Sequence, residues 1–112
     1  MNLSLYFGPD WNIPGFSIDG RRYYPGVMVR GQLGLRNSTT AIRSKVSQRN
    51  RILAWEKSIC PKRRIHMITF AGVIELIMHS STPEAKRIKS YLIDAIIIQH
   101  AGEISMRDQQ QM

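Results

Sequence analysis

Alternating apolar and polar residues predict strands near the start of the chain. "LSLYF", residues 3–7, alternates briefly and predicts a short strand before the turn-forming residues of "GPDWNIPG". "FSIDGRRYY", residues 16–24, places Asp19 and Gly20 between two strand-like runs. This dipeptide favours a type I′ turn, in which both central residues need positive φ. We therefore expect a β-hairpin at residues 16–24.

Two short helices are expected after this hairpin. The apolar residues within 27–33 predict a helix that ends at Gly34. "RNSTTAIRSKV" predicts the second helix, because Ile42 and Val46 are four residues apart and so share a face. Its alternative N-cap residues are Asn37, Ser38 and Thr39. The two elements would form a helix-turn-helix-like pair.

The middle of the chain is mostly polar. "SQRNRILAWEKSICPKRR", residues 47–64, predicts a strand or a loop that leads into a second hairpin arm. In "RRIHMITF", Ile65 and Met67 alternate with Arg64, His66 and Ile68. This alternation predicts a half-buried strand.

Residues 69–79 predict a helix. Thr69 is its expected N-cap, and Val73 and Leu76 fall on one apolar face. Glu75 is expected on the exposed side of the same helix.

The next helix has two alternative start positions within "SSTPEAK". Ser81 and Glu84 match a capping box, whereas Thr82 as N-cap would place Pro83 at the favoured first helical position. Gly102 is the expected end. Apolar residues recur at three- and four-residue spacing, namely at Ala85, Ile88, Leu92, Ala95 and Ile96. We expect the apolar faces of these helices to support the hairpin and hold the basic helix pair outward.

These elements predict an α+β fold: a small single domain with an N-terminal β-hairpin, a short helix-turn-helix-like pair, a further strand and two C-terminal helices. A length of 112 residues suits one domain. We expect it at residues 1–104, followed by a flexible polar tail at 105–112. The longest apolar stretch, "YLIDAIII", is too short to span a membrane and contains Asp94, and the first residues lack the pattern of a signal peptide.

Positive charge is concentrated in one segment. Residues 21–64 hold 12 of the 16 Lys and Arg residues and one of the 8 acids, Glu56, so this segment carries +11 while the rest carries −3. Such a distribution predicts contact with nucleic-acid phosphates. For any single residue the alternative is a helix cap or a solvated side chain. The candidate nucleic-acid-binding residues are Arg36, Asn37, Thr39, Thr40, Arg43 and Lys45, with Arg49, Arg51, Lys62, Arg63 and Arg64 as a second strip.

Other chemistry is not expected from the sequence. The three histidines, His66, His79 and His100, are far apart and lack Cys or paired carboxylates at metal-ligand spacing. Cys60 is the lone cysteine and is expected to be an inert loop residue. We predict no cofactor, no metal and no catalytic residues, and therefore not an enzyme.

Four aromatic residues have two interpretations. They are either a platform on which single-stranded bases stack or part of the core, and the core is expected. The four are Tyr23, Tyr24, Trp55 and Phe70.

Three segments carry a family resemblance: "FSIDGRRYYPGVMVRGQLGLRNSTTAI", "HMITFAG" and "ELIMHSSTPEAKRIKSYLIDAII". They resemble the Bro-N domain, found at the N-terminus of baculovirus repeated-ORF proteins and of many phage antirepressors. The chain departs from that family at Met28, where an Asp is usual, and at Tyr91, where a Trp is usual. The matching residues are Asp19, Gly20, Tyr23, Tyr24, Leu33, Gly34, Asn37, Gly72, Leu76, Ser80, Pro83, Glu84, Ala85 and Lys86, and Tyr91 matches in being aromatic.

The resemblance implies a DNA-binding domain used in viral or prophage gene regulation. We expect it to bind DNA, with a preference for duplex. Its expected location is the host cytoplasm, at the nucleoid, or the nucleus if the host is eukaryotic. An alternative from the same family is an antirepressor that binds a repressor protein directly, without DNA. The almost wholly apolar "YLIDAIII" also suggests a homodimer through Tyr91, Leu92, Ile96 and Ile97.

Overall fold

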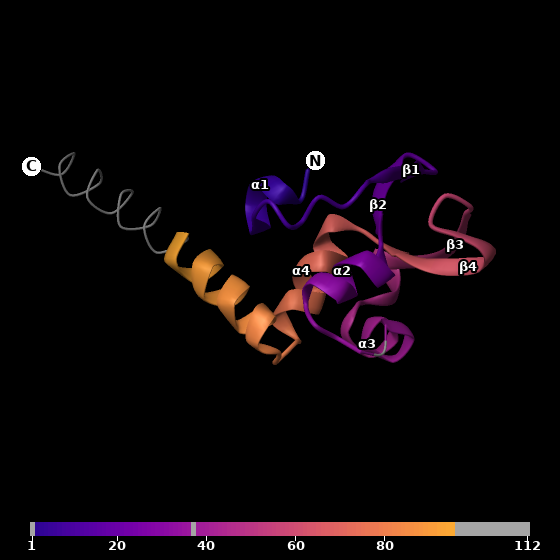
Figure 1. Ribbon diagram of the computed structural model, residues 1–112. Helices are drawn as coiled ribbons and strands as arrows, with labels where there is room; N and C mark the ends of the chain where they lie inside the picture. The colour runs from indigo at the N-terminus through magenta and orange to yellow at the C-terminus, as the bar shows by residue number, and fades with distance from the viewer. Residues whose placement is uncertain (1, 37, 96–112) are drawn as a thin grey trace, which may run out of the picture.

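The computed structural model describes residues 2–36 and 38–95, which form an α+β domain (Figure 1). Its antiparallel sheet has the strand order β1-β2-β4-β3. The strands are β1 (Phe16–Ile18), β2 (Arg21–Pro25), β3 (Arg51–Glu56) and β4 (Cys60–Ile68). The helices are α1 (Ser4–Phe7), α2 (Gly26–Gln32), α3 (Ser38–Lys45), the 3-10 turn η1 (Gln48–Asn50), α4 (Phe70–Met78) and a helix at residues 83–95.

This arrangement confirms the predicted fold class, including the hairpin, the helix pair and the C-terminal helices. Of the two alternatives for residues 47–64, a strand or a loop, the structure has strands: β3 and the first half of β4. Gly102 and the expected tail at 105–112 lie outside the described residues.

The first hairpin forms as its turn chemistry predicts. Asp19 and Gly20 have φ values of 50° and 80°, the left-handed conformation that both central residues of a type I′ turn require. Ile18 pairs with Arg21 directly across this turn. The hairpin delivers β2 to the centre of the sheet, beside β4.

The prediction of a strand at residues 3–7 was wrong, because α1 forms there. Leu3 is fully buried and Phe7 packs on the same core, four residues away, which is a helical spacing. The Asn2 side chain accepts a hydrogen bond from the Ser4 N–H (3.1 Å) and so helps to start the turn. The brief alternation of residues 3–7 is compatible with a strand or with a helix, and the packing of Leu3 and Phe7 on the core favours the helix.

A left-handed glycine ends α2 and sets the path to α3. Gly34 has φ +68°; its N–H donates to the Gly31 carbonyl (3.2 Å), and the Leu35 N–H donates to the Arg30 carbonyl (3.1 Å). This is a Schellman motif. The Arg30 guanidinium also donates to the carbonyls of Leu35 and Arg36, both at 2.8 Å, so it is a structural residue of this connection.

The helix at residues 83–95 starts in only one of the two predicted registers. Thr82 accepts a hydrogen bond from the Ala85 N–H (3.2 Å), so Thr82 is the N-cap and Pro83 the first helical residue. The Thr82 hydroxyl also donates to the Leu33 carbonyl (2.5 Å), which ties this helix to the end of α2. The role expected for Glu84 in a capping box was wrong, because its carboxylate lies against Gly34.

Buried side chains lie on both faces of the sheet. The main core joins the helices to the sheet through residues such as Tyr24, Ile42, Ile68 and Leu76. A smaller cluster consists of the buried residues Tyr23, Ile65 and Met67, and partly buried side chains of β1 and β3 pack against it. Ile68 is therefore fully buried, which corrects its expected place on the polar face of β4. Tyr23 and Tyr24 are core residues as predicted.

Two further expectations about single side chains were wrong. Trp55 is 54% exposed and is not a core residue. Glu75 is half-buried on α4, where it accepts hydrogen bonds from the Ser47 N–H (3.2 Å), the Ser47 hydroxyl and the Asn50 side chain. The hydrogen bond from the Ser47 hydroxyl is the main cause that lowers the pKa of Glu75. These contacts fix η1, and hence the start of β3, onto α4.

The helix at residues 83–95 leaves the body of the domain on the side away from the β3–β4 hairpin (Figure 1). Ala85 is fully buried at its start, whereas Tyr91 and Ile93 are exposed further on. Within the part of the chain that the structure describes, no helix is long and apolar enough to cross a membrane.

Candidate nucleic-acid interface

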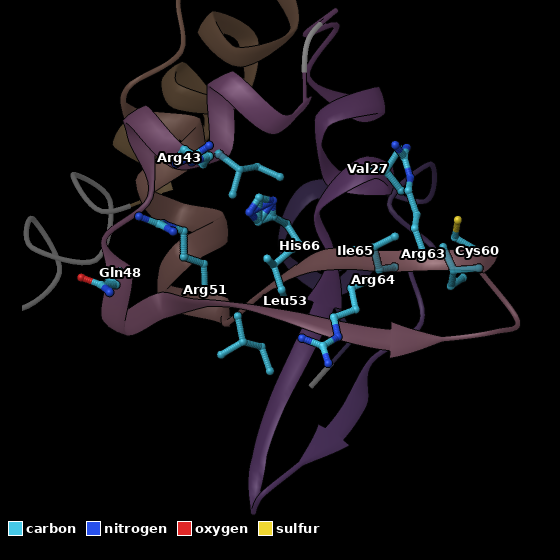
Figure 2. A pocket seen from close by; sticks show the side chains of 13 residues that line it. Val27, Arg43, Gln48, Arg51, Leu53, Cys60, Arg63, Arg64, Ile65 and His66 are labelled. Atoms are coloured by element: carbon cyan, nitrogen blue, oxygen red, sulfur yellow. The ribbon is translucent and has the colours of Figure 1, made fainter.

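A hollow of about 710 Å³ opens between α3 and the β3–β4 hairpin, and we call it the basic groove (Figure 2). Cationic, polar and apolar side chains all line it. Among residues 2–36 and 38–95, no carboxylate lines it. The polar lining residues are Arg43, Gln48, Arg51, Arg63, Arg64 and His66; the others are Val27, Ile42, Ile52, Leu53, Ile59, Cys60 and Ile65.

One end of the basic groove is held by α3 and β3. Ile42 is buried against the start of α2, where a Cβ on Gly26 would overlap its side chain, so the glycine permits this close approach. The neighbouring Arg43 is exposed and lines the groove. On β3, the Arg51 Nε donates to the Val46 carbonyl (3.1 Å), which orients the guanidinium.

An irregularity in β4 supplies the arginines at the other end. Ala54 pairs with Ile65 and Glu56 with Cys60, so residues 61–64 bulge opposite a single residue of β3. Neighbouring side chains of a regular strand point to opposite faces, but a bulge re-aims them. This explains how Arg63 and Arg64, adjacent in sequence, both line the basic groove.

The pKa of His66 is affected by the positive charge of the groove. It pairs with Leu53 of β3 and lies between the arginines in Figure 2. Burial is the main cause that lowers the pKa of His66, and the charges of Arg51 and Arg43 lower it further. The imidazole is therefore largely neutral at pH 7, and two guanidinium groups are close enough to act on it.

Cys60 begins β4, so its expected place in a loop was wrong. Hydrogen bonding from the backbone N–H of Lys62 is the main cause that lowers the pKa of its thiol, and Arg63 contributes in the same direction. The groove therefore favours negative charge at this end as well.

Four of the predicted binding residues meet in the basic groove: Arg43, Arg51, Arg63 and Arg64. Lys45 lies in a separate hollow of about 500 Å³, where its Nζ donates to the His79 carbonyl (2.9 Å). Arg36, Thr40, Arg49 and Lys62 are exposed outside the lining of the groove. Asn37 and the side chain of Thr39 are outside the described residues.

Sequence reasoning missed two polar lining residues, His66 and Gln48, and the apolar lining residues. His66 had a usable signal, because it follows Arg64 by two residues and so shares a strand face with it. Gln48 had none, since its position depends on η1, which the contacts of Glu75 with Ser47 and Asn50 hold in place.

The model of the BRO family, N-terminal domain (Bro-N), matches residues 13–98. No curated protein and no solved structure matches this chain. The match covers both helix pairs and the whole sheet, and Leu3 and Trp11, which precede it, pack into the same core. The chain therefore belongs to the BRO family through its N-terminal domain, a domain known in phage and viral DNA-binding regulatory proteins.

Proposed function

We propose that this domain binds DNA, duplex in preference, by holding the phosphate backbone in the basic groove. The observation that carries the proposal is the convergence of four arginines from α3, β3 and β4 on one hollow that no described carboxylate lines. The proposed role is regulatory, as in other Bro-N proteins, and it assigns no catalytic step to the chain.

The chemistry of the groove supports this role. A guanidinium group donates two parallel hydrogen bonds to a phosphate, and Arg51 is already oriented by its bond to Val46. The side chain of Gln48 is suited to the edge of adenine. In the proposed complex, the arginines set the register on the backbone while Gln48 supplies sequence preference.

The test is fluorescence anisotropy of a labelled random-sequence duplex, titrated at several salt concentrations. Each neutralised phosphate contributes about −0.9 to the log–log slope of affinity against salt. The variant Arg43→Gln/Arg51→Gln should bind more weakly and lose about 1.8 from the slope. The control, Lys86→Gln/Arg87→Gln, removes the same charge from exposed positions on the helix at residues 83–95 and should bind as wild type does.

A second readout locates the DNA within the groove. Phosphates near Arg43 and Arg51 would offset their charges, so the pKa of His66 should rise when duplex is added. An NMR titration of the histidine ring protons measures this. Equal weakening by both double variants, or a pKa of His66 that does not change with DNA, would refute binding in the groove.

An antirepressor function is the second candidate. It is favoured by the exposed apolar side chains of the helix at residues 83–95, where Tyr91 is 63% and Ile93 50% exposed. A repressor bound there should be captured from nuclease-treated host extract by wild type and lost with Tyr91→Ser/Ile93→Ser. The same variant tests the proposed homodimer by light scattering, to which Leu92 would also contribute; Ile96 and Ile97 lie outside the described residues.

A further inference from the structure

Two large apolar side chains of β3 lie outside the core of the domain. Burial alternates along the strand, and Leu53 and Trp55 are its exposed positions, at 58% and 54%. Tryptophan is usually highly buried, as Trp11 is here at 3% exposure. Neither core cluster of the described residues includes Leu53 or Trp55. Packing within the domain therefore does not account for them.

These side chains lie on the edge of the sheet, because β3 is the last strand in the order β1-β2-β4-β3. Neighbouring exposed apolar side chains on a strand at the edge of a sheet are a common binding surface for another molecule. A second copy of the same edge would be repelled, since the hairpin exposes Lys57, Lys62, Arg63 and Arg64. Charge complementarity favours a polyanion with apolar surfaces, and DNA base pairs between phosphate backbones fit that description.

The edge is continuous with the basic groove. Leu53 lines the groove beside Arg51, while Trp55 lies opposite the bulged residues 61–64, which include two of the groove's arginines. A backbone held on those arginines would place its base pairs next to this edge. The cations around Trp55 would also neutralise phosphates that approach one another when a duplex bends.

We propose that β3 inserts Trp55 between neighbouring base pairs of duplex DNA, with Leu53 beside it, and bends the duplex at that step. This inference rests on the DNA-binding function proposed above. Apolar side chains that enter a base step partly unstack it and kink the duplex, and the bend brings more protein surface into contact. Leu53 and Trp55 are thus a wedge, and the basic groove is the clamp that holds the DNA on it.

The test is fluorescence resonance energy transfer across a duplex of about 20 base pairs, the length of a site that a protein bends, with dyes at its two ends. Wild-type protein should increase the transfer efficiency. Trp55→Ala should abolish the increase and weaken binding roughly 5- to 150-fold, the range expected for losing one aromatic–base contact. The salt slope should fall by less than the roughly 1.8 lost with Arg43→Gln/Arg51→Gln, because the four arginines that hold the backbone are unchanged. Trp55→Phe should retain part of the bend.

Leu5→Ala is the control, since Leu5 of α1 is also a large apolar side chain, 79% exposed and outside the lining of the basic groove. It should bend DNA as wild type does. Equal bending by Trp55→Ala and wild type overturns the inference, as does a defect confined to single-stranded oligonucleotides, which would assign Trp55 to stacking on unpaired bases. A wild-type protein that binds duplex without bending it also overturns the inference but leaves the proposed function intact, whereas a wild-type protein that binds no DNA refutes both.

Discussion

Replacing Gly72 with alanine should destabilise the domain, even though alanine is the better helix former. Gly72 is buried on α4, at the point where this helix meets η1 and the end of β4. A Cβ at this position would lie 2.9 Å from the Asn50 carbonyl oxygen, 3.1 Å from the Val46 Cγ1 and 3.2 Å from the Ile68 Cβ. The carbonyl cannot easily move, because it accepts the Thr69 N–H (2.9 Å).

The sign follows from two opposing free energies. Alanine in place of glycine stabilises a helix by about 1 kcal/mol. Extra volume in a tightly packed site costs about 1–3 kcal/mol, and contact with an immovable backbone oxygen places Gly72→Ala toward the upper end. We expect a net loss of about 1–2 kcal/mol in the free energy of unfolding.

Gly31→Ala is the matched control, because a Cβ at Gly31 of α2 would meet nothing within 4 Å. Here only the helix preference acts, so stability should rise by about 0.5–1 kcal/mol. Urea unfolding of both variants measures the two changes. If Gly72→Ala proves as stable as Gly31→Ala, α4 does not pack closely against Asn50, the residue just before β3. The explanation of how the basic groove is positioned would then be wrong as well.

Three further changes test single contacts. Thr82→Ala should cost about 1 kcal/mol of stability in urea unfolding, because it removes an N-cap, whereas Ser81→Ala should change it by less than about 0.5 kcal/mol. Arg51→Gln should raise the pKa of His66 in an NMR titration, yet leave it below its usual value because burial remains the main cause. Since the pKa of Glu75 is lowered in the fold, its ionised form stabilises the domain above a pH of about 4.3, and this contribution is lost as the pH falls through the lowered value. Glu75→Gln should therefore flatten the acid-unfolding curve in that range.

The turns and helix caps were the most predictable features, because each depends on local chemistry. The Asp19–Gly20 turn, the glycine at Gly34 and the cap at Thr69 follow from φ preferences and hydrogen bonds to nearby N–H groups. Where two local signals competed, as in "SSTPEAK", only a distant contact decided between them: Thr82 also donates to the Leu33 carbonyl.

Features that depend on long-range packing were not predictable from the pattern. Glu75 was expected in solvent, but it accepts hydrogen bonds from Ser47 and Asn50, more than 20 residues away. The bulge opposite Trp55 likewise has no local signal in "CPKRR", although it aims both Arg63 and Arg64 into the groove. Sequence therefore supplied the residue types of the candidate site, and the bulge decided which of them meet.

The number of cations in the sequence overstates how many can contact phosphates, because some of them donate hydrogen bonds to carbonyl groups within the domain. Arg30 donates to the carbonyls that follow α2, Lys45 to the His79 carbonyl and Arg21 to the Arg49 carbonyl. The segment at residues 21–64 carries +11, which would give a salt slope near −10 if every charge met a phosphate.

The four arginines of the basic groove give a smaller value, about −3.5. We therefore expect wild-type protein on random duplex to show a slope close to −3.5 in the anisotropy titration. A slope of about −6 or steeper would mean that exposed cations outside the groove, such as Arg36, Arg49 and Lys62, also contact the backbone. In that case Arg49→Gln/Lys62→Gln should reduce the slope as much as Arg43→Gln/Arg51→Gln does, and the interface would extend along both sides of the β3–β4 hairpin.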